Sequence, residues 1–364
     1  MIPGVQVFVY PEELAATRPD ALARQIVRLG CDAVSLAVVY HRARRVLPRQ
    51  RRVSVLTETT FYFAPEETRY GELVPRANAP RELVDDVLRF RDACDRAGLR
   101  FRTWVVTLHH DVLAREHPDA AARFLDGSPT GVGLCPSAPA AVEYVRALVA
   151  DVSATFAPDA VELEAALYPA WEPAYTLTLA LDPPSEQERL RLSQCFCASC
   201  RSLFGERANE LERCAGEGEL PPELAELRAA GAARLVDAAA EAAHTAGTSL
   251  RVFASGPPEQ AALQGLSSRT VAAADRLLIG CGPLAGDELL ERFRSLRALV
   301  DDRPATPSLN WTPARDLAAD AARVAEAGAE GLALYNLSLV PEAGVAAFGG
   351  AAAAFHAAAA VRSS

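Results

Sequence analysis

The sequence predicts a single (β/α)₈ (TIM) barrel with long loops after its second, third and fourth strands. Eight apolar, β-branched runs of strand length alternate with amphipathic helical patterns along the 364 residues. Several helical patterns end in Ala-Gly just before the next run, which is a common way for a helix to end. An open, doubly wound sheet is the alternative, but no glycine-rich phosphate-binding fingerprint follows the first run.

The predicted strands are rich in Val, Leu, Ala and aromatic residues and lie at 5–10, 33–40, 100–108, 160–165, 249–254, 276–282, 305–311 and 331–337. Helical patterns are clearest over 81–98, 140–156 and 314–329. The long segments 41–80, 109–139 and 165–218 show no helical pattern. They follow strands two, three and four, so we expect them at the C-terminal face, which holds the active site in barrels. We therefore expect residues 1–364 to form one domain, with 165–218 as a loop insertion.

Composition limits the partners and the location of the protein. Half of the residues are hydrophobic and 23% are charged, as in soluble globular proteins. The net charge of −10 argues against nucleic acid as a main partner, and the one basic run, 41–52, is short and typical of a solvated loop. We see no secretory signal at the N-terminus and expect no membrane span, since the apolar run 348–361 consists mostly of small residues. A cytoplasmic location with reduced cysteines is the expectation. The oligomeric state is left open.

Three cysteines lie within six residues of each other in "CFCASC", at the spacing C-x-C-x-x-C: Cys195, Cys197 and Cys200. Reduced, clustered cysteines favour a metal site, and zinc takes four tetrahedral ligands. The fourth ligand could be Cys135, on the neighbouring loop after strand three, or Cys214, which is close in sequence. Four thiolates would leave no open position for water, so the zinc would be structural. The alternative is that these cysteines are small buried hydrophobic residues.

Strand four carries two acids, Glu162 and Glu164, which alternation places on one face about 7 Å apart. Outward-pointing acids would press against the apolar helix layer, so we expect both to point into the barrel. Glu162 lies deeper, between Arg102 and Arg251 on the flanking strands, and is interpreted as a paired structural charge. Glu164 lies nearest the rim, where an enclosed carboxyl has the raised pKa that a general acid needs.

Aromatic, histidine and asparagine side chains gather at the predicted strand ends, as expected of a pocket for a small carbohydrate or glycoside. They are Tyr40, His41, Trp104, His109, His110, Tyr168, Trp171, Asn310, Trp311, Tyr335 and Asn336. Alternatively, the rim histidines could bind a catalytic metal together with Asp111 or Glu164, in a metal-dependent hydrolase or isomerase. Adjacent histidines on a strand point to opposite sides, which disfavours a shared ion for His109 and His110.

The run "LCPSAPAAVEYVRALVADVSATF", the acidic strand end and "CFCASC" together resemble glycoside hydrolase family 42 β-galactosidases. More closely, the chain is similar to glycoside-hydrolase-like barrels of bacterial genomes. The resemblance is specific over about 135–200 and architectural elsewhere. It implies a structural zinc held by Cys135, Cys195, Cys197 and Cys200, and it implies that Glu164 is the general acid/base.

The chain departs from that family at two positions. Strand seven, where the family has its nucleophilic glutamate, ends in "PSLNWTPARD" with no acid before Asp316, and Leu163 stands where an asparagine normally precedes the acid/base. Retaining glycosidases need two carboxyl groups facing each other across the sugar. The second group could be Asp111, or the substrate could supply its own nucleophile. A third possibility is a carbohydrate-binding barrel without turnover.

Overall fold

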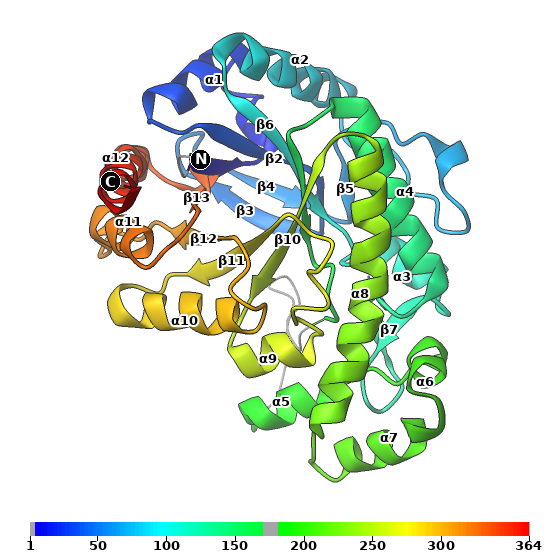
Figure 1. The fold of residues 1–364 in the computed structure, drawn as a ribbon. Helices are drawn as coiled ribbons and strands as arrows, with labels where there is room; N and C mark the ends of the chain where they lie inside the picture. The colour runs from blue at the N-terminus through cyan, green and yellow to red at the C-terminus, as the bar shows by residue number, and fades with distance from the viewer. Residues whose placement is uncertain (1–3, 170–180, 364) are drawn as a thin grey trace.

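The computed structural model describes residues 4–169 and 181–363. In this part of the chain, eight parallel strands form a closed barrel surrounded by helices (Figure 1). The barrel closes because β1 pairs in parallel with both β2 and the last strand, β13. The barrel strands are β1 (Gly4–Val9), β2 (Ala33–Tyr40), β6 (Arg100–Val106), β9 (Ala160–Glu164), β10 (Ser249–Ser255), β11 (Arg276–Gly282), β12 (Ala305–Asn310) and β13 (Gly331–Tyr335). All eight predicted strands, and with them the (β/α)₈ fold, are confirmed.

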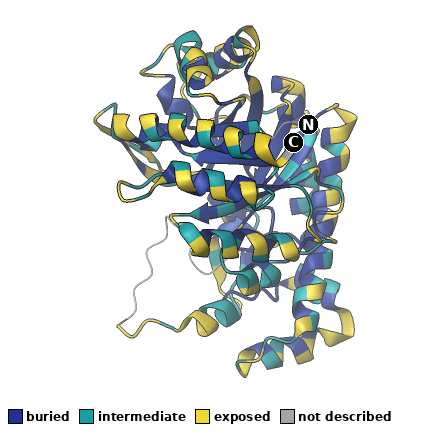
Figure 2. Cartoon of the chain, turned by 60° about the vertical axis from the view of Figure 1, so that its left-hand side comes forward, coloured by how far each residue is buried: buried dark blue, intermediate teal, exposed yellow. Residues whose placement is uncertain are grey.

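Each barrel strand is followed by a helix that packs outside the barrel. Figure 2 shows that these outer helices expose one face to solvent and bury the other against the barrel. These helices are α1 (Pro19–Arg28), α2 (Arg81–Ala97), α4 (Pro139–Phe156), α8 (Pro222–Thr245), α9 (Pro258–Leu263), α10 (Gly286–Ala298), α11 (Leu317–Glu326) and α12 (Glu342–Ser363). The predicted helix over 314–329 is shorter in the structure. The Asp316 side chain accepts a hydrogen bond from the Ala319 amide at 3.0 Å, and this cap sets the start of α11.

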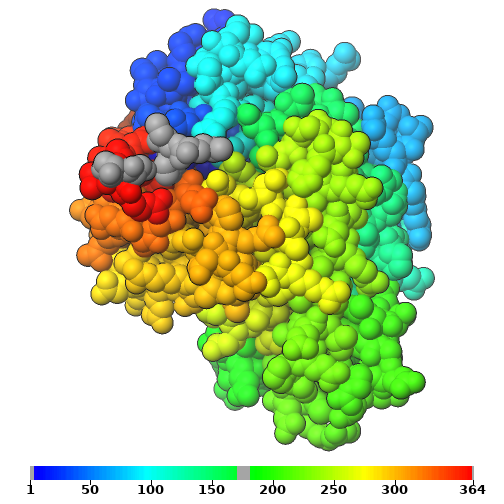
Figure 3. All heavy atoms as spheres, viewed as in Figure 1, coloured from blue at the N-terminus to red at the C-terminus, as the bar shows by residue number. Residues whose placement is uncertain are grey.

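The segments after β2, β6 and β9 contain more regular structure than the sequence suggested. They hold β3 (Ala43–Leu47), β4 (Arg52–Leu56), β5 (Thr60–Phe61), η2 (Glu67–Arg69), α3 (Asp111–Glu116), β7 (Ala121–Arg123), β8 (Pro129–Leu134), α5 (Glu186–Leu192), α6 (Ala198–Phe204), η3 (Gly205–Arg207) and α7 (Ala208–Gly216). Two more 3₁₀ turns, η1 (Pro11–Glu13) and η4 (Leu337–Leu339), follow β1 and β13. The expectation of no helix in 109–139 and 165–218 was therefore wrong, because α3 and α5 to α7 are too short to show a clear period. Figure 1 places α5, α6 and α7 together beside the end of α8, and Figure 3 shows this region as a lobe on the surface.

Side chains that alternate along the strands fill the barrel interior in layers. The layer nearer the N-terminal end of the barrel is polar, with Gln6 and Ser35 both donating hydrogen bonds to the Glu162 carboxylate. One step further along the same strands, the interior becomes aromatic, and the rings of Phe8 and Trp104 lie 5.0 Å apart. This change from polar to aromatic layers sets the floor of the cavity described below.

One helix in the described part of the chain, Glu342–Arg362, is long and apolar enough to cross a membrane by length and composition. The expectation that no segment would pass this test was therefore wrong. In the structure, 39% of the most apolar 18-residue stretch of this helix is buried, and Phe348 and Phe355 are fully enclosed. The helix is therefore long and apolar enough to span a membrane, yet it packs as part of the barrel's outer layer. The cytoplasmic location stays a prediction.

Candidate active site

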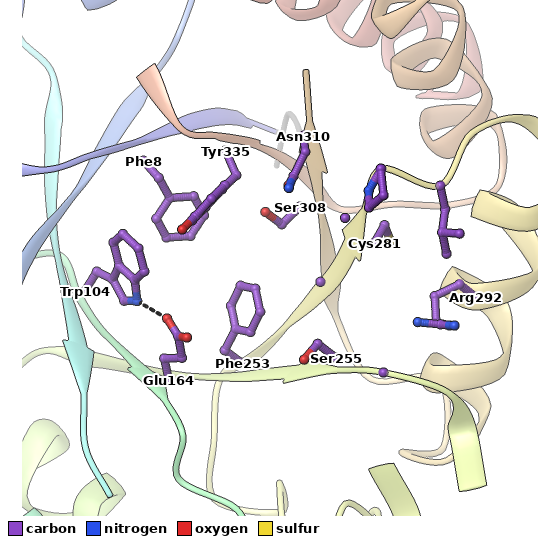
Figure 4. A pocket seen from close by; sticks show the side chains of 15 residues that line it. Phe8, Trp104, Glu164, Phe253, Ser255, Cys281, Arg292, Ser308, Asn310 and Tyr335 are labelled. Atoms are coloured by element: carbon purple, nitrogen blue, oxygen red, sulfur yellow. Dashed lines mark hydrogen bonds between the residues drawn. The ribbon is translucent and has the colours of Figure 1, made fainter. Parts of the chain in front are cut away.

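A cavity of about 400 Å³ lies at the C-terminal ends of the barrel strands. This is the size of a site for a small ligand, and it lies at the face where barrel enzymes hold their active sites. Figure 4 shows that its side chains converge from opposite walls of the barrel. The lining residues are Phe8, Trp104, Glu164, Phe253, Ser255, Gly256, Gly280, Cys281, Gly282, Pro283, Leu284, Arg292, Ser308, Asn310 and Tyr335.

Aromatic rings form the floor and one wall of the cavity. The Phe8 ring contacts Trp104 and Tyr335, with centroids 5.0 and 5.7 Å away. The Tyr335 hydroxyl lies 2.6 Å from that of Tyr10, which in turn donates to the Tyr40 hydroxyl at 2.9 Å. Phe8, Trp104 and Tyr335 thus line the cavity with apolar ring surface, which suits the C–H faces of a sugar, and the buried Tyr10 and Tyr40 hold Tyr335 in place from outside the cavity.

A glycine makes room for the cavity on β11. A Cβ atom at Gly280 would lie 2.9 Å both from Cε1 of Phe253 and from the Cβ of Ser255, which is closer than such atoms pack. A side chain at this position would therefore push the Phe253 ring into the space that the cavity occupies.

Glu164 is the one carboxylate among the described residues that line the cavity. Its Oε2 accepts a hydrogen bond from Trp104 Nε1 at 2.6 Å (Figure 4). Burial raises the pKa of Glu164 to about 7, and the hydrogen bond from Trp104 lowers it by less. The backbone is also fixed here, because the Glu164 carbonyl accepts from both the amide and the hydroxyl of Thr107, each at 2.9 Å. The side chain is thus a positioned acid that is partly protonated near neutral pH.

Glu162, two residues earlier on the same strand, is surrounded by hydrogen-bond donors and arginines. Its carboxylate accepts hydrogen bonds from Gln6 Nε2 at 3.0 and 3.1 Å and from the Ser35 hydroxyl at 2.5 Å. Arg251 lies 3.5 Å away and Arg102 lies 4.0 Å away. It is 1% exposed, so this is a compensated buried charge with no access to the cavity.

Asp111, proposed from the sequence as the second catalytic group, holds a loop instead. Its Oδ1 accepts hydrogen bonds from the amide and the hydroxyl of Thr59, both at 2.9 Å. It does not line the cavity. The geometry gives no support for Asp111 as a partner of Glu164.

The rim histidines are neutral and turned to local partners. Burial lowers the pKa of His41 to about 4 and the pKa values of His109 and His110 to about 3. His41 Nδ1 donates to the Arg42 carbonyl at 2.7 Å, and His110 Nδ1 accepts from the Leu113 amide as the cap of α3. Among residues 4–169 and 181–363, the cysteine cluster below is the one group of three or more potential ligands close enough for a metal, so these histidines do not form the metal site considered above.

The other predicted binding residues divide into two groups. Trp104, Asn310 and Tyr335 line the cavity. Tyr40 lies behind Trp104, with ring centroids 5.0 Å apart. The second group points elsewhere: Trp311 packs at the edge of the core, Asn336 caps η4 through the Ser338 amide, and Tyr168 lies under the Arg228 guanidinium. Trp171 lies outside the described residues.

The cysteine cluster has the predicted membership. The sulfur atoms of Cys135, Cys195, Cys197 and Cys200 all lie within 4.8 Å of one another and are buried. Cys135 and Cys200 are separated by 3.4 Å between sulfur atoms, too far for a disulfide. A tetrahedral zinc with bonds of about 2.3 Å would hold its sulfur ligands about 3.8 Å apart. The four thiols therefore fit a metal ion, and Cys214 is not part of the group.

Local structure explains how the cluster assembles. Cys135 ends the β7–β8 hairpin just before α4, and Cys197 caps α6, so that the two halves approach from the loops after β6 and β9. The Arg123 amide donates to the Cys195 sulfur at 3.2 Å. Hydrogen bonds from the other cysteines, Cys135 first, hold the pKa of Cys197 well below its usual range, whereas the pKa values of Cys135 and Cys200 are raised by hydrogen bonding within the group and by burial.

Several cavity residues were missed from the sequence. Phe8, Phe253 and Ser308 alternate with outward-facing residues on their strands. The two-residue period of side chains along a strand could therefore have predicted that they face the barrel interior. Arg292 stands on an outer helix, α10, and looks like any surface arginine in the sequence.

No protein-family model and no curated protein matches the sequence. Among solved structures, the chain is similar to α-L-fucosidase isoenzyme 2 from Paenibacillus thiaminolyticus, with a TM-score of 0.60, 13% identity and coverage of 97% of this chain and 49% of that one. It is also similar to the glycoside hydrolase domain of PgaB (BpsB) from Bordetella bronchiseptica, with a TM-score of 0.59, 15% identity and coverage of 93% and 95%.

A third similar structure is a β-galactosidase from the psychrophilic Marinomonas ef1, with a TM-score of 0.52, 14% identity and coverage of 92% of this chain and 54% of that one. The chain thus spans about half the length of the fucosidase and the β-galactosidase, and nearly all of the PgaB domain. At these identities the likeness concerns the barrel fold, and it does not transfer an activity.

Proposed function

We propose that this chain is a glycoside-hydrolase-like enzyme that acts on a small carbohydrate or glycoside, with Glu164 as its general acid. The observation that carries the proposal is the single positioned acid in an aromatic cavity at the C-terminal face. A pKa of about 7 leaves Glu164 able to hold a proton near neutral pH and to release it to a departing glycosidic oxygen. The fold shared with glycoside hydrolases supports this reading.

The roles of the neighbouring residues follow from their contacts. Trp104 lines the cavity and orients the acid through its Nε1 hydrogen bond. Asn310 and Ser308 supply amide and hydroxyl groups that can bind sugar hydroxyls. The four-cysteine group would hold a structural zinc that ties together the loops after β6 and β9, without taking part in the reaction.

The test of Glu164 uses substrates that differ in how much they need an acid. Wild-type protein and Glu164→Gln are compared on a panel of fucosides, galactosides and N-acetylglucosaminides, each with a 4-nitrophenyl and a phenyl leaving group. We expect Glu164→Gln to lose about 10²–10⁴-fold in kcat/KM on phenyl glycosides, and much less on 4-nitrophenyl glycosides, whose leaving group hardly needs a proton. Glu326→Gln, an exposed change on α11, is the matched control and should retain full activity.

Equal losses on both leaving groups would show that Glu164 does not act as a proton donor. A preference for N-acetylated substrates would support a reaction in which the substrate supplies its own nucleophile, the route that needs one protein carboxylate. Full activity of Glu164→Gln would remove the proposed role altogether.

A second candidate function is a carbohydrate-binding barrel without turnover. It is favoured by the presence of one carboxylate among the described cavity residues, where retaining and inverting glycosidases place two. It predicts that wild type and Glu164→Gln bind sugar with similar affinity and that neither cleaves it. Turnover by pure wild-type protein that is lost in Glu164→Gln would exclude this alternative.

A further inference from the structure

An unpaired arginine lines the same cavity as the proposed acid. Arg292 projects from α10 into the cavity, is partly buried, and forms no ion pair or hydrogen bond with the described residues. Figure 4 shows it on the far side of the cavity from Glu164, with Phe253 and Ser255 between them. A guanidinium carries five N–H donors, and none of those of Arg292 is used by the described residues. The half-buried group is therefore available to bind a ligand.

A second arginine near the same strand ends, Arg315, has a structural role and serves as a comparison for Arg292. Arg315 lies 2.7 Å from Asp320 and donates to the carbonyls of Gly282 and Asn310, where it fastens the ends of β11 and β12. Its charge is neutralised, and its donors are used. With the described residues Arg292 makes neither kind of contact, so fixing this part of the fold does not explain its position at the cavity.

The charge balance of the cavity points the same way. Among the described lining residues, Glu164 is the one carboxylic acid and Arg292 is the one basic side chain. The other lining residues are aromatic, aliphatic or neutral polar. Glu164 is partly protonated at neutral pH, whereas a guanidinium stays charged. The cavity therefore carries a net positive charge at the end away from Glu164.

We propose that Arg292 makes the cavity selective for sugars or glycosides that carry an anionic group, such as a carboxylate, phosphate or sulfate, at a position remote from the bond next to Glu164. The guanidinium would bind two oxygens of that group in the fork geometry that it offers to carboxylates and phosphates. This inference rests on the proposed function, because it assigns the substrate class of the same site. Arg292 would act in binding and not in the chemical step.

The test measures binding of matched neutral and anionic ligands by titration calorimetry at low salt. One arm compares phenyl 1-thio-β-D-glucuronide with phenyl 1-thio-β-D-glucoside, which resist cleavage, and the other compares glucose 6-phosphate with glucose. We expect wild-type protein to prefer at least one anionic ligand over its neutral counterpart by about five- to tenfold, as for a charge-assisted hydrogen-bonded pair at a partly exposed site. The arm with the larger preference identifies carboxylate or phosphate.

In Arg292→Gln this preference should disappear, while binding of the neutral ligands changes little. Arg294→Gln, an exposed change two residues further along the same helix, is the control and should keep the preference. In 0.5 M salt the wild-type preference should shrink, since salt screens a partly exposed charge pair.

The outcomes separate the two proposals. Equal affinity of wild type for anionic and neutral ligands, or a preference that survives in Arg292→Gln, would overturn the role of Arg292 but leave the proposed sugar site intact. If none of the four ligands binds to wild-type protein, the proposed role of Arg292 is overturned as well. Failure of the Glu164 proposal would appear only in the leaving-group experiment above, which does not depend on anionic substrates.

Discussion

Replacing Glu164 with Gln should make the protein more stable at alkaline pH, although the residue is proposed to be essential for activity. The substitution keeps the size of the side chain and an oxygen that can accept the 2.6 Å hydrogen bond from Trp104. What it removes is a carboxyl group that burial makes costly to ionise, with its pKa raised from 4.5 to about 7.

The sign and size of the effect follow from this pKa. Below pH 4.5 the carboxyl is protonated in both the folded and the unfolded chain, and it contributes nothing. As the pH rises from 4.5 to 7, the unfolded chain ionises first, so wild-type protein loses stability, and the loss is complete above pH 7. At 1.36 kcal/mol per pH unit the full loss is about 3 kcal/mol, of which roughly 2.5 kcal/mol develops between pH 5 and pH 8. For a chain of this length, that corresponds to about 3 °C in Tm.

Thermal unfolding of wild type and Glu164→Gln, followed by circular dichroism at pH 5, 6.5 and 8, measures this difference. The variant should gain on wild type as the pH rises. Glu162→Gln is the contrasting change on the same strand: it leaves Arg251 and Arg102 without their carboxylate and should cost about 3–5 kcal/mol at pH 8. A Tm difference between Glu164→Gln and wild type that does not change with pH would show that the pKa of Glu164 is not raised, and the general-acid argument would lose its physical basis.

Three further predictions concern the metal group, the reaction and the cavity. Cys197→Ser should lose the roughly one zinc per chain that mass spectrometry should find in wild type, whereas Cys214→Ser, outside the cluster, should keep it; metal retained in Cys197→Ser would contradict the assignment. The kcat/KM for a phenyl glycoside should fall about tenfold per pH unit above pH 7, because Glu164 must be protonated to act as an acid, and a flat profile up to pH 9 would contradict this. Gly280→Ala should weaken sugar binding about tenfold by displacing Phe253, while Gly216→Ala, which has no neighbour within 4 Å, should not; equal affinities would show that Gly280 does not shape the cavity.

The barrel could be predicted because its signals are local and repeated. Each strand is an apolar run, and alternation along "AVELEA" was enough to place Glu162 and Glu164 on the inner face. The pairing of Glu162 with Arg102 and Arg251 also followed, since neighbouring strands of a parallel barrel bring residues of the same layer together. Spacing and the adjacency of consecutive loops pointed to a cysteine group but left Cys135 and Cys214 as alternatives, and the choice of Cys135 came from the resemblance to family 42 β-galactosidases.

The site was less predictable because it depends on where side chains point after the strands end. His110 and Asp111 come shortly after β6, which ends at Val106, but there the chain turns into α3, and both side chains bond within that turn and its neighbouring loop. Strand period says nothing about such turns. Arg292 was missed for a related reason: its helix pattern is that of a surface helix, and only the position of α10 against the cavity separates it from the other arginines.

The cysteine group and the proposed acid are connected through Tyr168, four residues after Glu164. The Tyr168 hydroxyl shares a hydrogen bond with Ser137, which stands two residues after Cys135, and its ring lies 4.0 Å below the Arg228 guanidinium. Its amide and carbonyl are both held by Gln264, each at 3.0 Å. The chain leaving Glu164 is therefore fastened within four residues to the loop that carries one of the cysteines.

We infer from this connection that a zinc held by the four cysteines would also support Glu164. The loop after β9 starts at Glu164, the proposed proton donor. Ala165 turns the chain immediately, with a φ of 57° that a non-glycine residue seldom adopts. A backbone in that conformation persists only when its surroundings hold it, and here they are Thr107 on one side and the Tyr168 contacts on the other. Removal of the zinc proposed for the four cysteines would release the second of these supports while leaving the barrel strands paired. Cys197→Ser should therefore lower kcat on a glycoside while the circular dichroism spectrum of the barrel is retained, and this combination distinguishes a support for Glu164 from a general contribution to folding.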